Sequence, residues 1–241
     1  MSVSVKHPLD VMIRKLGGSG RFSQAEMFAL KSLSVVVRTL EAHHDIVPEG
    51  GPATHCCIVL SGWTCCYQLL DEGRRQLLSF HLPGDLPDLQ GLHLSEIDFG
   101  MATLTPAVVA YVPHTDLRRL IESFPGISTA LWHEAQVSAA IHRAWMSSLG
   151  RRAARERLAH LFCELYLRLK AVGLANGNTL PMPLRQPDLA DALGLTSVHV
   201  NRTLKDLRED GLISLKARRL EILDWARLQA IGQFSPRYLH G

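Results

Sequence analysis

The chain has 241 residues, of which 46% are hydrophobic and 20% charged, as in an ordinary soluble protein of one large or two modest domains. Its first ten residues lack the apolar core of a signal peptide, and no stretch approaches the roughly 20 apolar residues of a membrane span. These features exclude secreted and membrane-spanning classes, so we expect a cytoplasmic protein without a membrane partner.

The net charge of +3 is unevenly distributed along the chain. Residues 1–122 carry 10 Lys and Arg against 13 Asp and Glu, whereas residues 123–241 carry 16 against 10. A basic half beside an acidic half indicates that only the second half meets a polyanion.

The first half is expected to form one short helix and then strands. Residues 24–33 have the pattern of an amphipathic helix. Between residues 35 and 112, short runs of alternating or β-branched residues are separated by turn signals. Strands with a turn every eight to twelve residues predict an antiparallel barrel or sandwich. The predicted strands lie within residues 34–40, 56–60, 63–70, 75–82 and 107–112.

A long helix is predicted over residues 126–149, because turn residues are absent for more than twenty positions after Pro125. Its apolar residues lie on more than one face, so one side is expected to pack on the barrel and another on the same helix of a second copy. The alternative is an ordinary core helix. A second amphipathic helix is predicted over residues 151–170. The residues predicted to form the dimer contact are Val137, Ile141, Ala144 and Trp145.

Residues 187–215 have the pattern of a helix-turn-helix. Pro187 suits the first position of a short helix, and Gly194 suits a tight bend that needs positive φ. Thr196 is a suitable N-cap for a second helix over residues 197–209. The spacing from Ala190 through Gly194 to Val200 allows two helices to cross at a steep angle.

The outward side of the second helix carries residues suited to DNA. Arg can bond guanine, Asn can bond adenine, and Val can contact the thymine methyl group. The alternative is the solvated face of an ordinary amphipathic helix. Ser197, Val198, Asn201, Arg202 and Lys205 are the predicted major-groove residues, with Thr196 and His199 as phosphate contacts.

Two alternating runs follow, at residues 212–215 and 219–222, and predict a β-hairpin. Lys216 and Arg218 lie in its turn. A hairpin with a basic turn beside a helix-turn-helix is typical of a wing that contacts the DNA backbone.

Three segments together resemble the Crp/Fnr family of bacterial transcription regulators: GRRQLLSFHLPGDLPDL, ARERLAHLFCEL and LADALGLTSVHVNRTLKDLREDGLI. The resemblance implies an α+β fold. It divides into a β-roll over residues 1–122, a dimerisation helix over 123–150 and a winged helix-turn-helix over 151–241. The β-roll is a double-stranded barrel like a cyclic nucleotide-binding domain. The implied function is transcription regulation by a homodimer on near-palindromic double-stranded DNA, with RNA polymerase as partner if the protein activates.

Two departures from the family pattern concern function. No Arg stands between Arg75 and Arg118, and Glu96 and Asp98 lie near the expected place of the Arg that holds a cyclic phosphate. A phosphate would meet carboxylates there, so cyclic AMP is not expected as effector. Val198 stands where Crp-type and Fnr-type members have Glu, whereas Arg202 matches the family's base-contacting Arg. A different half-site is therefore expected.

Five cysteines, an odd number in a chain without a signal peptide, argue against a disulfide framework. None precedes Cys56, so the Fnr-type iron–sulfur arrangement is absent. If Ser61-Gly62 is a two-residue hairpin turn, Cys57 pairs with Cys66. Neighbouring cysteines on a strand then point to opposite faces, which disfavours a tetrathiolate zinc site.

No cofactor or metal site is predicted, and the histidines of the first half are expected on the surface. The thiols are expected to be small core side chains, with a thiol or metal sensor as the alternative. The sequence does not identify a small-molecule or redox effector, nor decide between activator and repressor. The four cysteines whose redox role stays open are Cys56, Cys57, Cys65 and Cys66.

Two other classes of protein are alternatives to a DNA-binding regulator. One is a cupin-like enzyme with a metal in its barrel, and the other is a sensor that regulates through protein contacts alone. The helix-turn-helix with its wing argues against the enzyme, so no enzymatic activity is expected. The sensor would have a vestigial helix-turn-helix, and the presence of Thr196, Asn201, Arg202 and Lys205 on one helix argues against it.

Overall fold

The computed structural model describes residues 7–18 and 22–240 of this α+β protein. The chain divides into two compact units, here called the first and second unit. The first consists of Met1–Gln68 and Phe80–Gln136, and the second of Leu69–Ser79 and Val137–Gly241. Helix α4 (Pro125–Arg151) contains the boundary between them. The predicted division at residues 122 and 150 stays a prediction.

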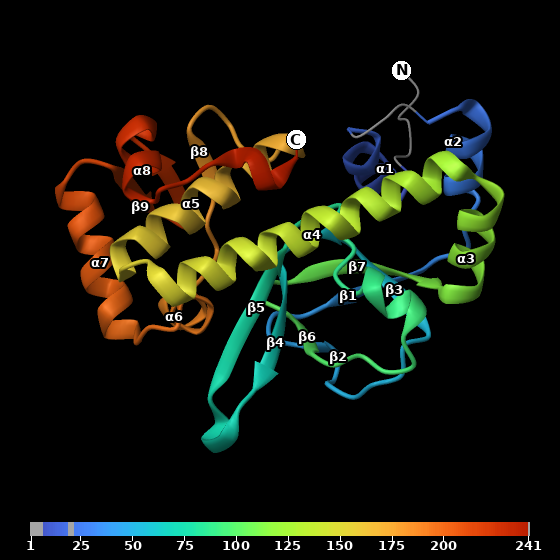
Figure 1. The fold of residues 1–241 in the computed structure, drawn as a ribbon, viewed down its shortest axis with the longest axis horizontal. Helices are drawn as coiled ribbons and strands as arrows, with labels where there is room; N and C mark the ends of the chain where they lie inside the picture. The colour runs from blue at the N-terminus through green and yellow to red at the C-terminus, as the bar shows by residue number, and fades with distance from the viewer. Residues whose placement is uncertain (1–6, 19–21, 241) are drawn as a thin grey trace. The chain divides into compact units, whose positions relative to one another are not determined.

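Two antiparallel sheets form within residues 36–113, as the alternating runs predict (Figure 1). The three-stranded sheet has the order β1 (Val36–Leu40), β7 (Ala107–Pro113), β3 (His55–Ser61). The four-stranded sheet has the order β2 (Asp45–Val47), β6 (Gly100–Thr103), β4 (Thr64–Leu69), β5 (Arg75–His81). Helices α1 (Asp10–Gly17), α2 (Gln24–Lys31) and α3 (His114–Ser123) accompany the sheets, with short 3₁₀ turns at Asp71–Gly73 and Leu89–His93. The predicted β-roll is confirmed.

The connection between β3 and β4 corrects the predicted hairpin. Cys57 pairs with Tyr111 of β7, and Cys66 pairs with Met101 of β6. The two strands therefore belong to different sheets, and the expected pairing of Cys57 with Cys66 is wrong. The chain crosses between sheets at Gly62, whose φ is +82° and whose Cβ, if present, would lie 2.4 Å from the Pro106 carbonyl oxygen. Only glycine fits both conditions.

Helix α1, which the sequence analysis did not predict, belongs to the core of the first unit. Its Met12, Ile13 and Leu16 are buried in the same cluster as Ile127 of α4. Lys15 of α1 forms ion pairs with Asp85 and Glu134. This salt bridge fixes the Pro-Gly-Asp turn against two helices of the unit.

The histidines of the first unit are not all at the surface. His81 and His114 are only 6% and 4% exposed, which corrects the expectation for these two. His81 lies on β5, and His114 begins α3.

The second unit is helical with a small sheet. Helix α5 (Ala154–Ala171) follows α4, and the expected helices over 126–149 and 151–170 are confirmed. The later elements are α6 (Gln186–Leu193), α7 (Ser197–Glu209), α8 (Trp225–Ile231) and a 3₁₀ turn at Pro236–Leu239. The sheet has the order β8 (Thr179–Pro181), β10 (Arg219–Ile222), β9 (Ile213–Lys216). Strand β8 and helix α8 were not predicted.

Glu164 of α5 is the centre of a buried polar cluster in this unit. It is fully buried and accepts hydrogen bonds from Tyr238 Oη (2.8 Å), Trp145 Nε1 (3.1 Å) and Arg168 Nη1 (3.2 Å). His160 lies 3.1 Å from the same Tyr238 hydroxyl and 3.1 Å from the Gly232 carbonyl oxygen. The cluster joins the end of α4 and the C-terminal segment to α5.

Within the described residues, every helix is too short or too polar to cross a bilayer.

Candidate nucleic-acid interface

Both ends of helix α6 are capped. Asp188, at its third position, accepts a hydrogen bond from the Arg185 backbone N–H at 2.8 Å, which satisfies an otherwise unpaired donor of the helix start. At the other end, Gly194 has φ +61° and forms the left-handed cap predicted for this bend. Leu189 and Leu193 are buried, as expected for the inward face of a first helix.

Helix α7 has the predicted bounds and the predicted cap. The Thr196 hydroxyl accepts from the His199 N–H at 3.2 Å. Three apolar side chains at helical spacing are buried at 0–4% exposure: Val200, Leu204 and Leu207. Because this stripe packs inward, the opposite side of α7 is open to solvent.

The predicted major-groove residues lie on that open side. Val198 is 80% exposed, and Asn201 and Arg202 are also exposed. Ser197 is half-buried, and Lys205 is exposed with its ammonium 3.6 Å from Glu209. Because the Thr196 hydroxyl oxygen accepts the hydrogen bond from the His199 N–H, its own proton can be donated to a phosphate oxygen. His199 is half-buried.

The wing is a tight hairpin between β9 and β10, with Lys216 paired to Arg219. Its two turn residues, Ala217 and Arg218, have φ of +48° and +58°. Such a turn joins two strands with the correct twist, yet neither residue is glycine. Lys216 and Arg218 are both exposed, so the turn presents two cations.

The contacts that hold the wing and the end of α7 in place were not predicted from the sequence. β8 pairs with β10, and the Met182 N–H donates to the Arg218 carbonyl oxygen at 2.8 Å. Arg155 of α5 forms an ion pair with Asp210 at the end of α7. The Thr179–Pro181 segment is too short to predict as a strand, and an ion pair across 55 positions has no local sequence signal.

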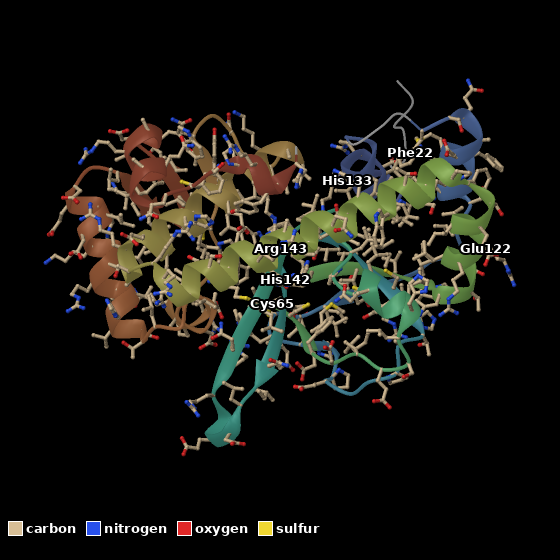
Figure 2. All side chains as sticks on the ribbon, viewed as in Figure 1. Phe22, Cys65, Glu122, His133, His142 and Arg143 are labelled. Atoms are coloured by element: carbon tan, nitrogen blue, oxygen red, sulfur yellow. The ribbon has the colours of Figure 1, made fainter. Side chains whose placement is uncertain are left out.

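The four residues predicted for the dimer contact do not share one environment. Ile141 and Trp145 are only 8% and 7% exposed within the single chain, and Val137 and Ala144 are half-buried. The large apolar residues left exposed on α4 are Trp132 at 67% and Met146 at 73%. The side chains of His142 and Arg143, on the same helix, are exposed to solvent (Figure 2).

The thiols of the first unit are all buried. Asp88 accepts from the Cys57 N–H at 2.8 Å and from the Cys56 thiol at 3.4 Å, and burial raises the pKa of Asp88 to about 6. Burial also raises the pKa of Cys57. The Cys66 sulfur lies 3.4 Å from His81 Nε2. Over the described ranges no three His, Cys, Asp or Glu side chains are arranged to hold a metal ion.

Two crossed helices, a glycine bend and an adjoining basic hairpin define a winged helix-turn-helix DNA-binding protein. Comparison with known families agrees. Residues 156–231 match the Crp-like helix-turn-helix domain, and residues 37–124 match the cyclic nucleotide-binding domain.

Individual relatives match between 72% and 91% of the chain. The nitrogen fixation regulation protein FixK of Bradyrhizobium diazoefficiens is 34% identical over 72% of this chain and 72% of its own length. The transcriptional activator protein FnrL of Cereibacter sphaeroides is 27% identical over 91% of this chain and 89% of its own. The solved structure of FixK2 from Bradyrhizobium japonicum superposes with a TM-score of 0.75 at 27% identity, covering 83% and 98% of the two chains. The chain therefore belongs to the Crp/Fnr family of DNA-binding transcription regulators and is not an enzyme.

Proposed function

We propose that this protein regulates transcription as a homodimer that places two copies of α7 in successive major grooves of a near-palindromic site. The observation that supports this is the open side of α7, where Val198, Asn201 and Arg202 stand exposed on a helix whose opposite stripe is buried. Two symmetric recognition helices require half-sites about one helical turn, ~34 Å, apart.

Arg202 is assigned to a base and Lys216 or Arg218 to phosphates. Replacing Arg202 by Ala should weaken binding to a selected site by about 1–3 kcal/mol and relax preference at one base pair of each half-site. Replacing Lys216 by Ala should weaken binding to all sequences alike and lower the salt slope by about one per subunit. Affinity for selected and scrambled duplexes over a salt series separates the two roles. Equal loss on both duplexes for Arg202→Ala would show that Arg202 contacts only the backbone.

For the dimer we propose a stripe of α4 whose members are exposed, except for the half-buried Ala139. Trp132, Gln136, Ala139, Arg143 and Met146 follow one another at alternating spacings of four and three, the repeat by which two helices form a coiled coil. Val137 and Ala144 flank this stripe, whereas Ile141 and Trp145 pack inside their own chain.

Met146→Glu should give monomers in analytical ultracentrifugation at micromolar concentration, because a charge would be buried at the seam. His142→Glu, at another exposed position of α4 outside the stripe, is the matched control and should stay dimeric. A dimeric Met146→Glu protein would place the interface elsewhere.

Cyclic nucleotides are not the proposed effector. After the Gly-Asp turn, the chain buries Leu86, Leu89 and Leu92 in the core together with the acid Asp88, and no Arg lies between residues 75 and 118. An anionic phosphate has no guanidinium to pair with in that segment. Isothermal titration with cyclic AMP or cyclic GMP should show no saturable heat below about millimolar concentration. A Kd of about 1 mM corresponds to a binding free energy of only about 4 kcal/mol. Micromolar binding would contradict the assignment.

Because the protein would act on promoter DNA, we propose that it is located in the cytoplasm. FnrL, one of its relatives, is named a transcriptional activator. RNA polymerase is the partner that activation requires.

A further inference from the structure

The segment that connects β4 to β5 contacts the first helix of the helix-turn-helix. Arg75, the first residue of β5, places Nε and Nη2 each 2.9 Å from Asp191 Oδ2 of α6. The same Nη2 lies 3.6 Å from Asp188 Oδ1. The neighbouring Gln76 donates to the Ala192 carbonyl oxygen at 3.4 Å. Two consecutive residues of the hairpin thus meet three residues of α6.

Asp188 depends on this contact. Its side chain is 1% exposed, and its Oδ2 is satisfied by the Arg185 N–H and faces the Arg185 guanidinium at 3.4 Å. Among the described residues no hydrogen bond reaches its buried Oδ1, for which Arg75 supplies the opposite charge. Removal of the Arg75 guanidinium would leave that oxygen buried without compensation at the start of α6.

The contact leaves the DNA-facing side of α7 open. Arg75 and Gln76 meet α6, whereas Val198, Asn201 and Arg202 stay exposed on α7. Arg75 also places one positive charge beside two carboxylates of α6, which reduces the repulsion that these acids would exert on DNA phosphates.

We propose that Arg75 is a positioning residue for DNA binding. Its ion pairs with Asp191 and Asp188, here called the clasp, hold α6 in place, and the packing of α6 on α7 then fixes the recognition helix. The proposal rests on DNA binding by the helix-turn-helix and not on which residues contact the bases.

The test is the affinity of Arg75→Ala for a selected duplex across a salt series. Arg74→Ala is the matched control, because Arg74 is the exposed neighbour, and its guanidinium lies 3.4 Å from the carbonyl oxygen of Asp71 and makes no ion pair with another described residue. We expect Arg75→Ala to bind about fivefold more weakly, a modest coupling between distant groups, while Arg74→Ala binds like wild type. The salt slope of Arg75→Ala should equal that of wild type.

Several outcomes would overturn the proposal. A salt slope lowered by about one per subunit would mean that Arg75 itself contacts phosphate. Unchanged affinity would mean that the clasp does not position α7, and tighter binding would mean that it opposes DNA binding. Wild-type binding, measured in parallel, tests DNA recognition separately.

A double-mutant cycle tests whether Arg75 acts through α6. In an Asp191→Asn background, the loss caused by Arg75→Ala should shrink to less than half, because the partner is already neutral. Additive losses would contradict the assignment. Arg75→Lys keeps the charge but loses the planar fork, so it should bind with intermediate affinity even if Arg75→Ala proves too unstable to assay.

Discussion

Glu164 of the second unit and Asp88 of the first are both buried acids, and different kinds of partner hold them. In the second unit, Glu164 accepts from the cationic Arg168 as well as from Trp145 and Tyr238. In the first unit, the donors to Asp88 are an N–H and a thiol, both neutral, and burial raises its pKa to about 6.

Burial raises the pKa of both acids, but in Glu164 the charge of Arg168 opposes that rise. An acid surrounded by donors on both oxygens fixes the elements that supply them, here the end of α4, helix α5 and the C-terminal segment. A buried acid without a cation changes its protonation near neutral pH. The buried acid of the second unit is therefore paired with a cation and joins three elements, whereas the donors to the buried acid of the first unit are neutral.

The largest expected effect is that of Glu164→Gln. Both carboxylate oxygens accept from donors, so an amide group in either orientation puts NH₂ against Trp145 and another donor. We expect a loss of about 3 kcal/mol in the free energy of unfolding of the second unit. Urea unfolding, monitored through hydrogen exchange of the α5 amides, measures this loss of stability. Glu209→Gln, on the exposed side of α7, is the control and should change stability by less than about 0.5 kcal/mol.

The next effect concerns pH and His160. Burial, with the charge of Arg152 second, lowers the pKa of His160 from 6.5 to about 4. The unfolded chain therefore binds the proton first, and the second unit should lose stability as pH falls from about 6.5 to about 4, by about 3 kcal/mol in all. His160→Gln should remove this part of the slope, although it also loses the ring stacked on Tyr238. An unchanged slope in the variant would assign the acid sensitivity to another group.

Asp88→Asn is expected to have the smallest effect of the three, and with the opposite sign. The folded pKa of Asp88, about 6, is raised above 3.8, so its contribution is favourable at low pH and is lost as pH rises through that window. Asn keeps the acceptor for the Cys57 N–H and carries no charge. At pH 8 the first unit should gain about 2 kcal/mol, measured by hydrogen exchange in β3 and β7. Destabilisation at pH 8 would show that the carboxylate charge is stabilising there, and the contrast with Glu164 would fail.

The sequence predicts the second unit better than the first, and the reason is the range of the signals. The bounds of α7 follow from the Thr196 cap and a periodic stripe, both within a dozen residues. The start of α6 and the bend at Gly194 are equally local.

What the sequence did not predict depends on distant partners. Helix α1 has only eight residues, and its apolar face is meaningful only beside α4. The Ser61-Gly62 pair fits a hairpin and a crossing between sheets equally well. The Arg75–Asp191 pair spans 116 positions.

The dimer contact shows the same limit. Helix α4 is apolar on several sides, and the pattern alone does not tell which side packs within its own chain. The structure assigns Ile141 and Trp145 to the interior and leaves Trp132 and Met146 exposed.

The burial of all five cysteines gives the molecule a set of internal reporters of local opening. Four lie in the first unit, and the fifth, Cys163, lies in α5 of the second. A thiol reagent added to native protein reacts only when a unit opens, so the modified peptides identify which unit opened and the rate gives how often. A cysteine introduced at an exposed position would react with the label at once, while the five buried native thiols would stay unlabelled. The wild-type chain thus serves unaltered as the background for placing single fluorescent probes on its hairpin or its wing.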